Sequence, residues 1–238
     1  GQISDWKACA FSNAARNGVF AADLARRGLT GPAEIFEGPR GLMRQVTGPF
    51  ELAWSGGPDD WMIGRTYIKY WPAEYHAQSA IDAALQLRPL IGDAARIERI
   101  VIESFEAAVS IIGSEPEKWR PTSRETADHS MPYMVAVALL DRTRIVETEA
   151  CNRGYPAGIP NHLRIGLSDG REVDRRVDFP RGHAGNPMTD DEVFAKFRGL
   201  ADGVIAPATA ERMISQAMEL ETLDDPAELV EFATTAGH

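Results

Sequence analysis

The sequence of 238 residues is poor in cysteine and has no long apolar run. Its two cysteines, Cys9 and Cys151, are too few for a disulfide framework and do not have the CxxC spacing of a metal site. No stretch approaches the roughly 20 apolar residues that a membrane-spanning helix needs, and no signal peptide opens the chain. These absences favour a soluble, cytoplasmic protein that is not embedded in a membrane.

Motifs that bind common cofactors are missing as well. The sequence contains no GxxxxGK[ST], GxGxxG, HExxH or GxSxG motif. Its five histidines are scattered, and none lies at a metal-ligand spacing from another His or Cys. We therefore expect neither a metal nor an organic cofactor.

The charge balance is acidic, with a formal net charge of −10 and a pI near 5.0. Such a balance argues against a broad nucleic-acid-binding surface. It does not exclude a small anionic substrate, because a few basic residues can dominate the potential inside a pocket. Hydrophobic residues make up 44% of the chain, which is enough for a packed core in one large domain or two small ones.

Periodicity predicts helices at both ends of the chain. An Ala- and Leu-rich helix begins near Trp6, is capped by Ser4 or Asp5 and stops at Gly28, with a second helical start at Pro32. Residues 36–65 are rich in Gly and Pro, which predicts loop with short helical pieces. Near the other end, residues 189–192 form a capping box before one helix, and residues 208–220 and 224–238 predict two more.

The middle of the sequence predicts mixed structure. HAQSAIDAALQL is expected to form a helix closed by Pro89, RIERIVIESF a strand, and residues 113–128 a polar loop. SMPYMVAVALLD predicts a buried helix, and we expect it to belong to a core rather than to an interface. Alternating apolar residues on both sides of residues 168–170 predict a β-hairpin. Helices flanking a mixed section suggest a helical unit packed with a small α+β unit.

Several basic and polar side chains are candidates for chemistry, but their positions alone leave structural roles open. Lysines are mostly exposed or lie over aromatic neighbours. A histidine can cap a helix, a tyrosine can be buried with a satisfied hydroxyl, and an arginine can form a surface salt bridge. The candidates are Lys7, Lys69, His76, His129, Tyr133 and Arg181.

Four long segments, in order, carry a resemblance that spans nearly the whole chain: SDWKACAFSNAARNGVFAADLARRGLTGP, KYWPAEYHAQSAIDAALQL, HSMPYMVAVALLD and VDFPRGHAGNPMTDDEVFAKFRGLA. They resemble the MmgE/PrpD family, which includes 2-methylcitrate dehydratases and cis-aconitate decarboxylases. The resemblance implies an α+β fold with a discontinuous all-helical domain, a smaller α+β lid domain and an active site in the cleft between them. Residues 1–68 would end the first helical part, residues 69–180 would form the lid, and residues 181–238 would be the returning helices.

The resemblance implies a cofactor-independent lyase that dehydrates a tricarboxylate similar to 2-methylcitrate. Lys7 matches the family's lysine on the SxWK helix, and Lys69 matches the lysine that opens the lid. Both would stabilise the charge that builds on a substrate carboxylate in the transition state. Tyr133, from the HSxxY helix start, would act as the general acid that protonates the leaving hydroxyl.

The same resemblance implies three substrate-binding residues. His76 lies in the HAQ segment, and His129 is the histidine of the HSxxY motif. Arg181, in PRGH, is a weaker candidate for a grip on a second carboxylate, since a surface salt bridge is the alternative for this side chain.

Other functions stay open from the sequence. Decarboxylation of cis-aconitate or epimerisation of a dicarboxylate would use the same lysines, because each reaction passes through a carboxylate-stabilised carbon. The chain begins at Gly1 and lacks the long helical portion that supplies an aspartate and a histidine in the family, and its lid looks shorter between Leu140 and Val146. We therefore expect a piece of a longer protein, or a subunit that completes a partner's site. The resemblance also implies a homodimer.

Overall fold

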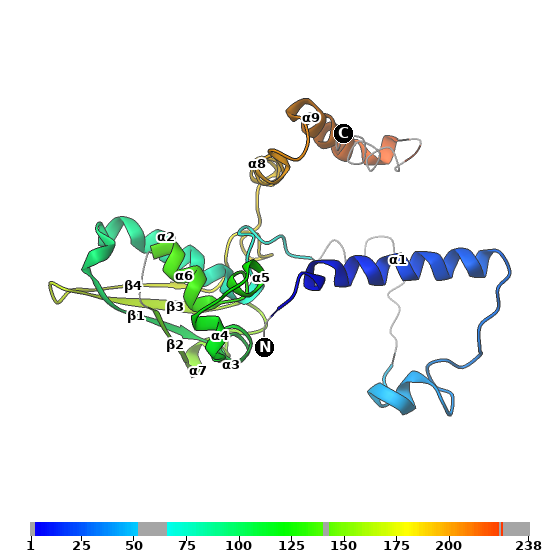
Figure 1. Ribbon diagram of the computed structural model, residues 1–238, viewed down its shortest axis with the longest axis horizontal. Helices are drawn as coiled ribbons and strands as arrows, with labels where there is room; N and C mark the ends of the chain where they lie inside the picture. Colours follow the sequence, from blue (N-terminus) through cyan, green and yellow to red (C-terminus); the bar gives the residue numbers. More distant parts are fainter. Residues whose placement is uncertain (1–2, 52–65, 140–142, 224, 226–238) are drawn as a thin grey trace.

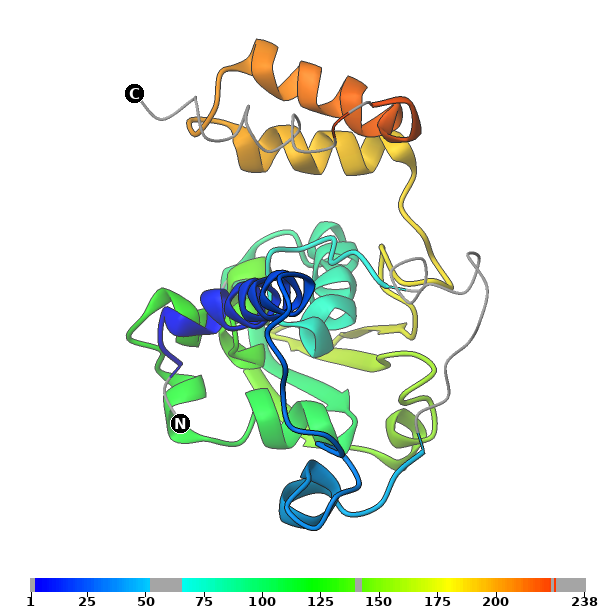
Figure 2. The same ribbon diagram turned by 90° about the vertical axis from the view of Figure 1, so that its right-hand side faces the viewer.

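The computed structural model describes residues 3–51, 66–139, 143–223 and 225. A body of helices and strands spans residues 66–188, and helices flank it on both sides in the sequence. Helix α1 (Trp6–Arg26) points away from the sheet in Figure 1. Helices α8 (Asp190–Ala201) and α9 (Pro207–Met218) pack side by side, apart from the sheet in both Figure 1 and Figure 2.

The body is built on a four-stranded sheet with the strand order β2-β1-β3-β4. Strand β1 is parallel to β2 and antiparallel to β3, and β3 is antiparallel to β4. The sequence predicted β1 and the β3–β4 hairpin, which are confirmed, but it did not predict β2. The strands are β1 (Ile97–Ser104), β2 (Thr143–Glu147), β3 (Asn161–Leu167) and β4 (Glu172–Val177).

The core lies where helices α2 (Gln78–Ile91) and α6 (Met131–Leu139) pack on each other and on the sheet. Along β3 the burial alternates, so that Leu163, Ile165 and Leu167 are buried while Arg164 is exposed. Most of α6 is buried in the same core. The predicted buried helix and its place in a core are thereby confirmed.

The other face of the sheet carries charge. Arg164 donates hydrogen bonds to Glu172 at 2.9 Å and to Glu103 at 3.3 Å. His162 lies between two carboxylates, with Nδ1 3.1 Å from Glu103 and Nε2 2.7 Å from Asp174. One apolar and one charged face are typical of a sheet that is covered on one side only.

Short helices connect the main elements. They are the α-helices α3 (Glu106–Ile112), α4 (Pro116–Trp119), α5 (Arg124–Ala127) and α7 (Glu149–Asn152), the π-helix η1 (Met43–Thr47), and the 3-10 helices η4 (Tyr75–Ala77), η5 (Ala94–Arg96) and η6 (Leu220–Thr222). The prediction of a loop over residues 113–128 was therefore wrong, because α4 and α5 lie within it. No helix in the described ranges is long and apolar enough to cross a lipid bilayer.

Two other local predictions were wrong. Helix α2 passes through Pro89 to Ile91, because a proline in the last turn removes only one helical hydrogen bond. It ends instead at Gly92, where φ is +74°. The helical start expected at Pro32 is absent from residues 31–41, which form turns closed by a hydrogen bond from the Gly38 N–H to the Glu34 carbonyl at 2.9 Å.

The ends of the flanking helices follow the sequence signals. Glu192 N–H donates to Thr189 Oγ1 at 3.3 Å, and Thr189 N–H donates to Glu192 Oε2 at 2.8 Å, so the predicted capping box is confirmed. Helix α1 starts after Asp5, whose side chain makes no capping hydrogen bond. Apart from residue 225, the helix predicted within residues 224–238 lies outside the described residues. Residues 140–142, which begin the stretch where a shorter lid was expected, lie outside them as well.

Candidate functional site

Lys69 lies on an extended segment, residues 66–73, that leads into the body. Two residues of α2 hold this segment. The side chain of Gln78 accepts a hydrogen bond from the Trp71 N–H at 3.0 Å and donates to the Trp71 carbonyl at 3.0 Å. Asp82, one turn later on the helix, accepts a hydrogen bond from the Trp71 indole at 2.6 Å. The backbone next to Lys69 is thus fastened to a core helix.

The outgoing segment, residues 180–183, lies beside the incoming one. Ile68 N–H donates to the Gly182 carbonyl at 3.2 Å, and Asp82 Oδ2 accepts the Arg181 N–H at 3.0 Å. Gly182 has a φ of +89°, and a Cβ atom there would lie 1.8 Å from the Ile68 carbonyl oxygen. Only glycine allows this approach. The Asp82 carboxylate and Gly182 therefore both connect the incoming segment to the outgoing one.

His76 is held by Glu74. The His76 N–H donates to Glu74 Oε2 at 2.7 Å, and His76 Nδ1 lies 3.0 Å from Glu74 Oε1. Burial alone would raise the pKa of Glu74, but hydrogen bonds and charge from His76, with the charge of Lys69, outweigh burial and lower that pKa. The ring of His76 therefore lies against this carboxylate, although its Nδ1 forms no hydrogen bond within the described residues.

The start of α6 brings His129 and Tyr133 to the same part of the body. Glu74 N–H donates to the Asp128 carbonyl at 2.9 Å, which joins the loop before α2 to the loop before α6. His129 Nδ1 lies 2.9 Å from the Glu125 carbonyl, which can only accept, so Nε2 carries the lone pair when the ring is neutral. Tyr133 is 45% exposed, and no described residue forms a hydrogen bond with its hydroxyl. A catalytic role for Tyr133 stays a prediction.

Lys7 and Arg181 have different surroundings. Lys7 is exposed in the first turn of α1, a helix in which no residue is buried. The Arg181 guanidinium donates to Glu192 Oε1 at 2.9 Å and to Asn186 Oδ1 at 2.9 Å. The hydrogen bond from Arg181 is the main cause that lowers the pKa of Glu192 to about 2. Arg181 thus forms the kind of ion pair considered as its alternative role. A catalytic role for Lys7 and substrate binding by Arg181 stay predictions.

The sequence did not indicate a role for His183, a buried histidine in this region. His183 lies between the rings of Tyr67 and Phe179, with centroids 4.4 Å and 5.0 Å away. Its Nδ1 accepts the Gly185 N–H at 2.9 Å. Burial lowers the pKa of His183, opposed by a backbone hydrogen bond to Ala157. A neutral, stacked His183 therefore holds the outgoing segment against the body.

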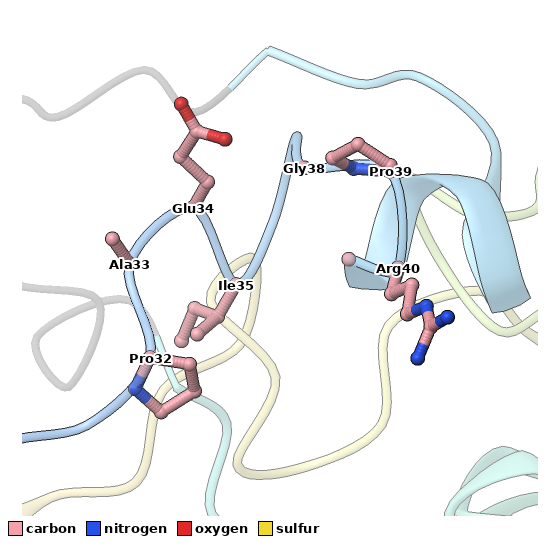
Figure 3. A pocket seen from close by; sticks show the side chains of 8 residues that line it. Pro32, Ala33, Glu34, Ile35, Gly38, Pro39 and Arg40 are labelled. Carbon is pink, nitrogen blue, oxygen red and sulfur yellow. The ribbon is translucent and has the colours of Figure 1, made fainter.

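Hollows in the surface lie in more than one place. One of about 520 Å³ is lined by residues of the loop 32–41 (Figure 3). Its walls are mostly backbone and apolar side chains, and the side chains of Glu34 and Arg40 point away from each other. A second hollow of about 230 Å³ lies beside Ile68, Gly182 and His183. Within the described ranges, no cluster of three or more His, Cys, Asp or Glu residues could hold a metal ion.

Glu74, Gln78 and Asp82 were also missed, although each leaves a trace in the sequence. Glu74 lies two residues before His76, at the N-cap of a helical turn. Gln78 and Asp82 are four residues apart, so they lie on one side of a helix that is otherwise rich in buried apolar residues. Polar residues at helical spacing inside an apolar pattern are the signal that identifies such anchors.

Two protein-family models match this chain, one over its first part and one over the body with α8 and α9. Residues 71–144 and 138–222 match the MmgE/PrpD C-terminal domain, and residues 1–55 match the MmgE/PrpD N-terminal domain. The chain belongs to the MmgE/PrpD family. This assignment confirms the resemblance that the four sequence segments carry.

Relatives in this family have two kinds of name. A 2-methylcitrate dehydratase of Cupriavidus necator is 31% identical over 219 residues, which cover 74% of this chain and 43% of the relative. A cis-aconitate decarboxylase of Mus musculus is 26% identical over 252 residues, covering 90% and 49%. A cis-aconitate decarboxylase-like protein of Aspergillus oryzae is 26% identical over 255 residues, covering 91% and 52%. The chain spans about half the length of these relatives.

Proposed function

We propose that this protein is a cofactor-independent lyase that dehydrates a tricarboxylate resembling 2-methylcitrate. The observation that carries the proposal is a contact between two of the four segments that resemble the family. The hydrogen bond from Glu74 N–H to the Asp128 carbonyl joins the stretch with Lys69 and His76 to the start of α6, which carries His129 and Tyr133. A cation, two imidazoles and a phenol can supply the charge stabilisation and the proton transfers of an elimination next to a carboxylate.

Dehydration removes a proton from the carbon next to a carboxylate and expels the hydroxyl from the neighbouring carbon. The C–H and C–O bonds break, a C=C bond forms, and the hydroxyl leaves as water. Negative charge builds on the carboxylate oxygens before the hydroxyl departs, so a cation placed there stabilises the transition state more than the ground state. Lys69 takes this role from the incoming segment, and Lys7 would add a second cation from α1.

Removal of the substrate proton and protonation of the leaving hydroxyl need groups with an available lone pair or proton. Nε2 of His129 can accept a hydrogen bond or a proton from the substrate, because Nδ1 of that ring faces the Glu125 carbonyl. His76 would bind the substrate from the loop before α2. Tyr133 protonates the leaving hydroxyl, since its own hydroxyl has no hydrogen-bond partner among the described residues. Arg181 would bind a second carboxylate only by leaving Glu192.

Substitution of Lys69 tests the proposal. We expect Lys69→Ala to lower kcat/KM about 100- to 1,000-fold, with little change in Tm. Arg153→Ala, which removes an exposed cation from the far end of α7, is the matched control and keeps wild-type kinetics. If Lys69→Ala unfolds the protein, or folds and keeps its turnover, Lys69 has no catalytic role.

Tyr133→Phe tests the general acid. The variant loses only a hydroxyl, so its free energy of unfolding is expected to stay within about 0.5 kcal/mol of wild type. Its kcat falls about 100-fold or more, and the pH profile of kcat loses the limb that the phenol provides. Unchanged turnover would make Tyr133 a packing residue of α6.

Decarboxylation of cis-aconitate is the second candidate, because relatives named for that reaction align with 90% and 91% of this chain. Epimerisation of a dicarboxylate and a non-catalytic subunit that completes a partner's site are further alternatives. The homodimer also stays a prediction. Product analysis separates these cases, since loss of water, loss of carbon dioxide and isotope exchange alone leave different products.

A further inference from the structure

Lys196 of α8 lies beside the segment that carries Lys69. Its Nζ donates a hydrogen bond to the carbonyl of Tyr70, the residue that follows Lys69, at 2.9 Å. Burial lowers the pKa of Lys196, and the charge of Lys69 lowers it further. Across the described ranges, neither lysine forms an ion pair with a carboxylate.

A hollow of about 350 Å³ opens at Lys196. Residues 70–72 of the incoming segment form one wall, and α8 forms the other through residues that include Glu192, Lys196 and Leu200. This volume falls in the range of small-molecule sites, about 300–1,000 Å³. The carboxylate of Glu192 is already bound by the Arg181 guanidinium, with N–O distances of 2.9 and 3.1 Å. Lys196 therefore supplies the uncompensated charge of the hollow.

We propose that Lys196 and Lys69 together bind one carboxylate group of a di- or tricarboxylate, with Lys196 reaching it from the hollow between residues 70–72 and α8. Two adjacent cations that form no ion pair within the described residues are stabilised by an anion that lies between them. The Lys196 ammonium has three N–H donors, and Tyr70 accepts one of them. The inference rests on the proposed function, because it names a further cation of the same substrate site.

Lys196 could instead be a structural clamp that only holds the Tyr70 carbonyl. Three variants separate the two roles. Lys196→Gln removes the charge and keeps an N–H donor, whereas Lys196→Arg keeps both charge and donors. Arg198→Gln removes one positive charge from the same helix, at a residue whose guanidinium binds Glu211 of α9 at 2.6 and 2.9 Å, and is the matched control.

The test is isothermal titration of the purified protein with tricarballylate, a tricarboxylate that has no hydroxyl to lose. We expect Lys196→Gln to raise Kd about 10- to 100-fold, Lys196→Arg to restore it to within about threefold of wild type, and Arg198→Gln to leave it unchanged. The salt dependence of Kd becomes weaker in Lys196→Gln. In the double variant with Lys69→Gln, the loss of affinity is smaller than the product of the two single losses, because both cations contact one group.

Two results overturn the inference: a wild-type protein that does not bind tricarballylate, or a Lys196→Gln variant that lowers Tm but keeps the wild-type Kd. Failure of the proposed function looks different, because binding of tricarballylate needs no turnover. Binding that depends on Lys196 without turnover of any hydroxy acid overturns the proposed dehydration and leaves the carboxylate site. Turnover without dependence on Lys196 overturns this inference alone.

Discussion

The α+β body and the helices that flank it bury apolar surface to very different extents. The body has one continuous core shared by α2, α6 and the sheet. Helices α1 and α8 contain no buried residue, and on α9 Ala210 alone is buried. Large apolar side chains such as Trp6, Phe11 and Phe20 are exposed along α1.

This difference separates two kinds of information in the sequence. A helical pattern predicts where a long helix forms, as it did for α1, α8 and α9 in the flanking helices and for α2 and α6 in the body. The pattern does not say which residues the apolar side chains of that helix contact. Those contacts come from tertiary packing, which supplies most of the stability of a helix in a protein. Stability should therefore reside in the body, and four measurements can break or sharpen that comparison.

Removal of a large core side chain has the largest expected effect. Phe105 is 1% exposed and stacks on Tyr155, with ring centroids 4.5 Å apart. Phe105→Ala should lower the free energy of unfolding by about 3–5 kcal/mol. Phe11→Ala in α1, where the ring is 85% exposed, should change it by less than about 0.5 kcal/mol. Equal losses in denaturant titrations would show that α1 is covered in solution.

The junction between the incoming and outgoing segments should respond next. In Gly182→Ala the new Cβ would meet the Ile68 carbonyl in addition to the strain of a φ of +89°. Gly28→Ala has a similar φ of +93° in open space, so it isolates the backbone strain, roughly 1–2 kcal/mol. We expect Gly182→Ala to lower Tm clearly further than Gly28→Ala. A Tm equal in the two variants would mean that the two segments do not touch.

Loss of a buried polar anchor comes third. Gln78→Leu leaves the Trp71 N–H and the Ala73 carbonyl without their partner, which should cost about 1–3 kcal/mol. Gln45→Leu, at an exposed position of η1, serves as the control and should cost less than about 0.5 kcal/mol. Chemical denaturation measures both variants. If Gln78→Leu costs no more than its control, α2 does not fasten the segment that carries Lys69.

How far the sequence predicted the molecule depends on how local each feature is. The capping box at Thr189, the turn at residues 168–170 and the buried helix α6 are written in neighbouring residues, and all three are confirmed. The hydrogen bond from Arg181 to Asp82 joins residues 99 positions apart, and the one from Lys196 to Tyr70 joins residues 126 apart. Nothing in the local pattern signals such pairs. Strand β2 was missed for the same reason, because its partner β1 is distant and parallel.

The smallest effect concerns the ion pair between the outgoing segment and α8. The pKa of Glu192 is lowered to about 2, chiefly by Arg181. A carboxyl whose pKa is depressed in the folded state stabilises the protein above its ordinary pKa of 4.5, and this contribution disappears as the pH falls toward about 2. The Tm difference between wild type and Glu192→Gln should therefore shrink over that range. A difference that does not change with pH would show that the ion pair does not form in solution.

Proton NMR in D2O tests the central claim most directly, that the residues around Lys69, His76 and Tyr133 act on a carboxylate substrate. The purified protein is incubated with 2-methylcitrate, citrate, cis-aconitate and small dicarboxylates in turn. The account predicts that the methyl doublet of 2-methylcitrate is replaced by a methyl singlet on a double bond, and that Lys69→Ala abolishes this change. No spectral change with any of these acids, from a sample shown to be folded, would contradict it.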